Sequence, residues 1–195
     1  MEKIILASQS PRRKALLELA QIPFEVVVKS TDETFPPDMP IEEVPVHLAR
    51  QKAIEVDKFL DKAYHKQHSK KNILAADTIV IVDNKIVTKP ENRKDAIEML
   101  CTLSGKKHKV ITGVVFLHQQ GEVSFSDVTE VEFHELARDQ VEYYVDTFKP
   151  FDKAGAYAIQ EWIGAVGIKC IHGDFYNVMG LPISRVVQEL AKIDS

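Results

Sequence analysis

Two serines and two arginines stand together near the start of the chain, in the segment S-Q-S-P-R-R. Ser10 suits the N-cap of a helix, and Pro11 suits its first position because its missing N–H would have had no intrahelical partner. A helix N-terminus attracts anions, and arginine holds phosphate through two parallel hydrogen bonds. The segment therefore predicts a phosphate site made by Ser8, Ser10, Arg12 and Arg13. The alternative is a capped surface helix with two solvated arginines.

Two carboxylates are candidates for the same chemistry. Asp77 lies in the middle of the apolar run 73–82, which predicts a buried central strand. An ionised carboxylate is strongly disfavoured there unless it is paired, hydrogen-bonded or metal-bound, so Asp77 is either a site residue or part of a structural ion pair. Glu33 belongs to an acidic T-D-E-T cluster in a predicted loop over residues 29–40, where the alternative is a solvated loop.

Two lysines complete the set of charged candidates. Lys52 falls on the apolar stripe of the helix predicted over residues 41–60. Lysine is rarely buried without a partner, so its ammonium either reaches past the edge of the core or points into an anionic site. Lys89 follows a strand that returns from a D-N hairpin turn, and we expect it near the strand of Asp77.

The elements that must position these residues alternate along the chain. Helices are predicted over 92–104, 138–147 and 182–193, strands over 24–28, 108–117 (interrupted by a T-G pair) and 162–171, a strand pair ending near 133, and a loop over 177–182. This order predicts an α/β fold with strands and helices around a cleft.

Composition bounds the class of protein. The 195 residues suit one domain, 1–195, with a substantial core, and the net charge of −4 disfavours general binding to nucleic acids or anionic membranes. The opening apolar run is too short to span a bilayer or act as a signal peptide. Cys101 and Cys170 have no metal-ligand spacing and are predicted to be reduced core residues. We therefore expect a cytoplasmic protein with no nucleic-acid or membrane partner.

Several cations, two carboxylates and a helix N-terminus suit a polyanion together with a divalent metal cation, Mg²⁺ or Mn²⁺. The chain has no Walker A motif, G-x-G-x-x-G, H-E-x-x-H or G-x-S-x-G elbow. This disfavours P-loop NTPases, kinases and dinucleotide dehydrogenases. The residues alone predict an enzyme with a phosphate-bearing ligand, assisted by a metal ion.

A series of short motifs extends this interpretation. S-x-S-P-R-R, L-A-x-x-K-A at Lys52, A-D-T-I-V at Asp77, K-P at Lys89, L-S-G followed by T-G-V, A-G-A-Y-x-I-Q ending at Gln160, and N-V-x-G-L-P over 177–182 occur in order along nearly the whole chain. Together they resemble the Maf family. The resemblance implies a mixed elongated β-sheet flanked by helices, with two lobes around a deep cleft as in inosine-triphosphatase-like proteins. It also implies a possible homodimer.

The resemblance further implies a metal-dependent nucleoside triphosphate pyrophosphatase, which cleaves the α–β anhydride to a monophosphate and diphosphate. Asp77 would be the proton acceptor that activates water, and Glu33 with Asp77 would bind the metal. The triphosphate would be held by Arg13, Lys52 and Lys89, with Ser8 and Ser10 lining it. Such proteins are viewed as house-cleaning enzymes or as inhibitors of septum formation.

Three positions bear on the nucleobase. Arg12, Thr78 and Gln160 resemble the branch that prefers dTTP and UTP, whereas the branch that acts on 7-methyl-GTP has an aromatic residue for the first arginine and glutamate for the glutamine. Thymine and uracil present an N–H donor beside carbonyl acceptors, which an amide can match; guanine presents two adjacent donors, which suit a carboxylate. The alternatives are a nucleotide-binding regulator of division without turnover, or a pyrophosphatase for 7-methyl-GTP or other modified nucleotides.

Overall fold

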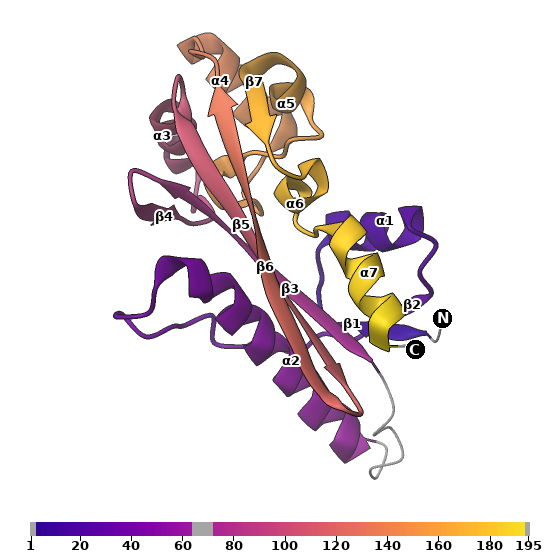
Figure 1. Ribbon diagram of the computed structural model, residues 1–195. Coiled ribbons are helices and arrows are strands. Elements are labelled where there is room, and N and C mark those ends of the chain that lie inside the picture. Colours follow the sequence, from indigo (N-terminus) through magenta and orange to yellow (C-terminus); the bar gives the residue numbers. More distant parts are fainter. Residues whose placement is uncertain (1–2, 64–71, 194–195) are drawn as a thin grey trace. The chain divides into compact units, whose positions relative to one another are not determined.

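A computed structural model describes residues 3–63 and 72–193. The histidines at 65 and 68, which belong to a predicted polar connector, lie outside this part. The elements, traced in Figure 1, are β1 (Ile4–Leu6), α1 (Pro11–Leu19), β2 (Phe24–Val26), the 3₁₀ helix η1 (Ile41–Glu43), α2 (Val44–Ala63), β3 (Ile73–Val82), β4 (Lys85–Val87), α3 (Arg93–Leu103), β5 (Lys107–His118), β6 (Gly121–Phe133), α4 (Arg138–Phe148), the 3₁₀ helix η2 (Ala154–Ala156), α5 (Trp162–Gly167), β7 (Ile168–His172), α6 (Phe175–Met179) and α7 (Ile183–Ile193).

The strands within the described residues form one seven-stranded mixed sheet in the order β2-β1-β3-β5-β6-β7, with β4 paired to β3. β1 runs parallel to β2 and β3, whereas β4 returns antiparallel along β3 and β7 antiparallel along β6. The β3–β4 turn has positive φ at Asp83 and Asn84, which a two-residue hairpin of this kind requires. The predicted α/β class and the hairpin are confirmed.

The chain divides into two compact units. Unit 1 comprises residues 1–77, 112–127 and 180–195, and unit 2 comprises residues 78–111 and 128–179. β3 therefore contributes its first half, ending at Asp77, to unit 1 and its second half to unit 2. No helix in the described residues is long and apolar enough to cross a membrane.

The core of unit 1 forms where the apolar stripe of α2 packs on the sheet. Its members are Ile5, Ala7, Ala49, Ala53, Val56, Leu60, Ile73, Ala75 and Val115. β5 approaches the start of α2 so closely that a Cβ at Gly113 would lie 2.3 Å from the Pro45 carbonyl carbon. The T-G pair was predicted to interrupt β5, but the strand is continuous. The glycine instead makes room for the backbone of α2.

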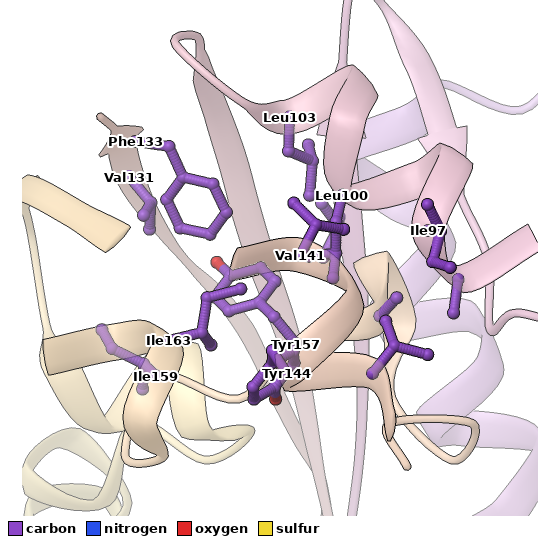
Figure 2. Close-up of a cluster of buried hydrophobic side chains, with 14 of the residues drawn as sticks. Ile97, Leu100, Leu103, Val131, Phe133, Val141, Tyr144, Tyr157, Ile159 and Ile163 are labelled. Atoms are coloured by element: carbon purple, nitrogen blue, oxygen red, sulfur yellow. The ribbon is translucent and has the colours of Figure 1, made fainter. Parts of the chain in front are cut away.

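The core of unit 2 is drawn in Figure 2. It packs α3, α4 and α5 against β3, β5 and β6, with Tyr144 and Phe133 among its largest fully buried side chains. Helices α3 and α4 agree with the predictions to within one residue at each end. Asn92 caps α3 by accepting a hydrogen bond from the Asp95 N–H at 3.0 Å.

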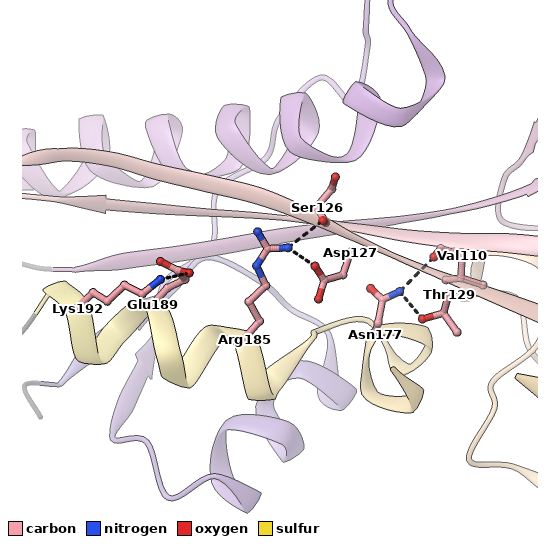
Figure 3. Close-up of polar contacts among 8 residues, drawn as sticks. All are labelled: Val110, Ser126, Asp127, Thr129, Asn177, Arg185, Glu189 and Lys192. Carbon is pink, nitrogen blue, oxygen red and sulfur yellow. Dashed lines mark hydrogen bonds and ion pairs between the residues drawn. The ribbon is translucent and has the colours of Figure 1, made fainter. Parts of the chain in front are cut away.

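Polar contacts also fix the C-terminal elements within each unit (Figure 3). In unit 1, the Arg185 guanidinium of α7 donates to Asp127 and to the Ser126 carbonyl. In unit 2, the buried Asn177 amide of α6 donates to the Val110 carbonyl at 3.1 Å and to the Thr129 hydroxyl at 2.9 Å. Residues 177–179, predicted as part of a loop, are therefore helical, because Asp174 accepts from the Tyr176 N–H and begins α6.

Two further predictions about secondary structure are wrong. The strand predicted over 162–171 is the short helix α5 followed by β7. α5 turns because Gly164 has no side chain: a Cβ there would lie 1.7 Å from the Ile159 carbonyl oxygen. The strand pair predicted to end near 133 is the single 13-residue strand β6.

The prediction that both cysteines lie in the core is also wrong. Cys101 is exposed on α3 because the buried face of that helix is made by Ala96, Ile97, Leu100 and Leu103. Cys170 is partly exposed on β7, the last strand of the sheet path. Both thiols are free.

We expect His108 to make the stability of the protein depend on pH. Its ring makes edge contacts with the rings of Phe133 and Tyr157 and contacts the Tyr157 hydroxyl at 2.7 Å, and burial lowers its pKa from 6.5 to about 4. Below pH 6.5 the unfolded chain binds a proton at this residue that the folded protein does not bind until about pH 4. The free energy of unfolding should therefore fall as the pH is lowered from 6.5 to about 4, and His108 should contribute up to about 3 kcal/mol to this fall.

Urea unfolding between pH 7 and pH 4 measures this contribution as a difference between the wild type and His108→Gln, whose side chain does not titrate. The difference in free energy of unfolding should change with pH in favour of the variant as the solution becomes more acidic. A pH-independent difference would contradict the assignment.

Candidate functional site

Arg13 is the buried arginine of the first helix. Ser10 caps α1 by accepting from the Arg13 N–H at 3.5 Å, so that the Arg13 side chain leaves from the first turn. The guanidinium donates to the Gly180 carbonyl at 2.7 Å and to the Ser8 hydroxyl at 3.1 Å. Only 8% of Arg13 and 6% of Ser8 are exposed. Ser8, Ser10 and Arg13 therefore lie together at the N-terminus of α1.

Lys52, Asp77 and Glu33 form one ion cluster. The Lys52 ammonium lies 2.5 Å from Asp77 Oδ1 and 2.9 Å from Glu33 Oε1. The side chains of Lys52 and Asp77 are 17% and 14% exposed, whereas Glu33 is 50% exposed. Of the two interpretations of Lys52, the structure supports an ammonium directed into an anionic site.

Arg13 interacts electrostatically with the carboxylates of this cluster. Burial lowers the pKa of Arg13 to about 10, and the nearby charges of Asp77 and Glu33 oppose this shift while Arg12 adds to it. Arg13 therefore keeps its proton at neutral pH. Arg12, Arg13 and Lys52 carry one more charge than Asp77 and Glu33 offset, and this excess of positive charge favours the binding of an anion.

The donor set fits a metal ion that arrives with a phosphate ligand. In the residues that the structure describes, no group of three or more His, Cys, Asp or Glu side chains could hold a metal ion unaided. Asp77 and Glu33 nevertheless converge on the same ammonium. Mg²⁺ is usually bound by one or two carboxylates together with phosphate oxygens and water, which is the set that these two residues can complete.

Three of the four remaining predicted site residues belong to unit 2. Thr78 follows Asp77 in β3 and is partly buried, and Lys89 is exposed two residues after β4. Gln160 is exposed in a turn before α5. The fourth of these residues, Arg12, lies on α1 in unit 1 and is partly exposed.

The segment before Gln160 is held by buried tyrosines. The Tyr157 hydroxyl contacts His108, and burial raises the pKa of the Tyr157 phenol well above its ordinary value. The Tyr144 hydroxyl accepts from the Ala158 N–H at 3.2 Å and donates to the Glu161 carboxylate. Gln160 is thus exposed between two anchored residues, which fixes its backbone while leaving the amide accessible.

Sequence reasoning missed two contacts of the cluster in unit 1. The Gly180 carbonyl, which accepts from Arg13, belongs to the N-V-x-G-L-P motif, and the sequence alone does not indicate a role for this carbonyl. Gln51 donates from Nε2 to the Thr34 carbonyl at 3.1 Å, beside the Glu33–Lys52 pair. Its position directly before Lys52 was the only signal in the sequence.

The fold and the cluster define a mixed α/β protein with a buried arginine at a helix N-terminus and a lysine–carboxylate cluster, suited to a phosphate-rich ligand. The model of the Maf-like protein family matches residues 3–193. The chain belongs to this family.

Relatives cover almost the whole chain. A Phocaeicola vulgatus protein named dTTP/UTP pyrophosphatase is 47% identical over 193 residues, which are 98% of this chain and 96% of that protein. A Bacillus mycoides protein of the same name is 46% identical over 195 residues, 100% of this chain and 97% of that protein. The structure of the Staphylococcus aureus Ham1 protein matches with a TM-score of 0.54 and 14% identity, covering 100% of both chains. This likeness concerns the fold alone and agrees with the expected mixed α/β architecture.

Proposed function

We propose that this protein is a nucleoside triphosphate pyrophosphatase that hydrolyses the α–β anhydride of dTTP and UTP to a monophosphate and diphosphate. The relatives' name, dTTP/UTP pyrophosphatase, supports the reaction class. The observation that carries the proposal is the Lys52 ammonium held between Asp77 and Glu33. It puts a movable cation directly beside a carboxylate that can act as a base.

In this proposal Asp77 is the general base. The free protein holds Asp77 Oδ1 at 2.5 Å from Lys52 Nζ. When a triphosphate binds, its oxygens compete for the ammonium, and Asp77 can then accept a proton from a water molecule. The water oxygen forms a bond to the α-phosphorus as the bond between that phosphorus and the bridging oxygen breaks, and diphosphate leaves.

The other charged residues hold the triphosphate. Arg13 keeps two of its donors on Gly180 and Ser8, so its orientation is set before the ligand arrives. Lys52 and Lys89 add charge, and Ser8, Ser10, Arg12 and Thr78 line the ligand. A Mg²⁺ or Mn²⁺ ion bound by Glu33 and Asp77 would neutralise charge on the phosphates. The proposal also includes a cytoplasmic homodimer with residues 1–195 as one domain, as the family resemblance implies.

Pyrophosphate release from a panel of nucleoside triphosphates, with and without Mg²⁺ or Mn²⁺, tests the reaction. We expect metal-dependent turnover concentrated on dTTP and UTP. Binding of nucleotide without turnover of any triphosphate would contradict the proposal and favour a binding-only protein. Turnover concentrated on 7-methyl-GTP would contradict the base preference alone.

Gln160→Glu tests the role of the amide in base preference. We expect the ratio of kcat/KM for dTTP to that for GTP to fall by roughly 5-fold, because one hydrogen bond at an exposed position contributes about 1 kcal/mol. Gln188→Glu, the same change on the exposed face of α7, is the matched control. An unchanged ratio in Gln160→Glu would assign base recognition to other residues.

A further inference from the structure

Side-chain contacts tie the loop that carries Glu33 to α2. Residues 27–36 form neither helix nor strand. Three contacts tie this loop to α2: the Lys29 ammonium lies 3.4 Å from the centre of the Phe59 ring, Glu33 pairs with Lys52, and Gln51 donates to the Thr34 carbonyl. The last two lie on adjacent residues of the helix and on adjacent residues of the loop.

These two adjacent contacts respond differently to a ligand. The Glu33–Lys52 pair is ionic, and the proposed function, on which this inference rests, requires Lys52 to turn toward the triphosphate. The Glu33–Lys52 pair then weakens, although Glu33 must stay beside Asp77 for the two carboxylates to bind the metal. The bond from Gln51 is neutral and involves no group that the ligand uses, so it can persist through this exchange.

The Gln51 amide has a defined orientation. One Nε2 hydrogen points to the Thr34 carbonyl at 3.1 Å, and the other can be accepted by His47 Nε2 at 3.0 Å in the tautomer protonated at Nδ1. The flipped amide would put its oxygen against the Thr34 carbonyl oxygen. Gln51 Oε1 is buried and has no hydrogen-bond partner among the described residues, so the donors alone determine the orientation.

We propose that Gln51 is a positioning residue that keeps Glu33 beside Asp77 when Lys52 transfers to the triphosphate. It does so by holding the neighbouring Thr34 carbonyl on α2. Groups that hydrogen-bond to a metal-ligating side chain typically contribute 10- to 100-fold to metal affinity. Gln51 acts through the residue next to Glu33, so we expect an effect at the lower end of this range.

The test uses Gln51→Met, which keeps the length of the side chain but cannot donate. In the nucleotide-free protein, trypsin should cleave after Lys29 faster than in the wild type, because the loop has lost a tether. With a non-hydrolysable α,β-methylene analogue of dTTP, Mn²⁺ binding followed by EPR should weaken roughly 10-fold. Gln188→Met, the same change on exposed α7, should alter neither quantity.

A double-mutant cycle separates positioning from general destabilisation. In a Glu33→Gln background, Gln51→Met should cause no further loss of Mn²⁺ affinity, because the carboxylate that it positions is gone. An equal loss in both backgrounds, or unchanged Mn²⁺ affinity in Gln51→Met, would overturn the proposal. Gln51→Leu, which also cannot donate and adds no charge, is measured in parallel and replaces Gln51→Met if that variant does not fold.

Failure of this proposal and failure of the proposed function give different results. Because the analogue is not hydrolysed, the Mn²⁺ measurement does not depend on turnover. A wild-type protein that binds Mn²⁺ and the analogue but releases no pyrophosphate would contradict the pyrophosphatase activity. The effect of Gln51→Met on Mn²⁺ affinity could still be measured in that case. A wild-type protein that binds neither would overturn both.

Discussion

Asp77→Asn is expected to lower kcat for dTTP hydrolysis by about 10³-fold while dTTP still binds. Asparagine has nearly the shape of aspartate, but its amide cannot accept the proton of the attacking water. It also removes one negative charge beside Lys52, so the affinity for the triphosphate measured without a divalent metal should be retained or increased. Pyrophosphate release measures the first effect, and calorimetric titration with dTTP measures the second.

Asp83→Asn is the matched control for this variant. Asp83 also pairs with a lysine, Lys106 at 2.8 Å, but the side chains of Asp83 and Lys106 are 65% and 44% exposed. We expect its turnover to equal that of the wild type. If Asp77→Asn retains full turnover, Asp77 is not the general base and its contact with Lys52 is a structural ion pair.

Lys52→Met is expected to raise KM and lower kcat, with a combined loss in kcat/KM of roughly 10²–10³-fold. A charge-assisted contact to phosphate contributes about 1.5–3 kcal/mol, and the variant also leaves Asp77 and Glu33 without the cation between them. Without this cation the two carboxylates repel each other in the free protein, so the free energy of unfolding should fall as well. Steady-state kinetics and urea unfolding measure the two effects.

Lys58→Met is the control on the same helix. Lys58 pairs with Glu55 at 2.6 Å, and its side chain is 60% exposed, so its removal should change little. Unchanged KM and kcat in Lys52→Met would show that the Lys52 ammonium does not act on the triphosphate, whatever its contacts in the free protein.

Local patterns predicted the elements that carry the charged site. The run 73–82 was expected as one buried strand, and β3 has these bounds. The stripe of α2 was expected from its periodicity, and Leu48, Val56 and Leu60 are buried as predicted. In both cases the hydrophobic period and the burial agree, so neighbouring elements did not need to be known.

Contacts between distant residues account for what the sequence did not predict. α5 was mistaken for a strand because its apolar residues suit either structure, and the decisive contact is between Gly164 and Ile159. Whether Lys52 was paired could not be decided from helix geometry, because Asp77 lies 25 residues further on. The Gly180 carbonyl, 167 residues from Arg13, carries no chemical signal of its own in the sequence.

The contact at Gly164 has a consequence for how this protein could acquire a new nucleotide preference. The Ile159 carbonyl rests against Gly164 where any side chain would collide with it, and Ile159 is bonded directly to Gln160. A substitution at 164 would force the backbone at Ile159 to shift and would thereby move the neighbouring Gln160 amide, which the proposed function places at the nucleobase. A selection for altered preference should recover changes at 164, and a mutagenesis library limited to ligand-lining positions would miss them.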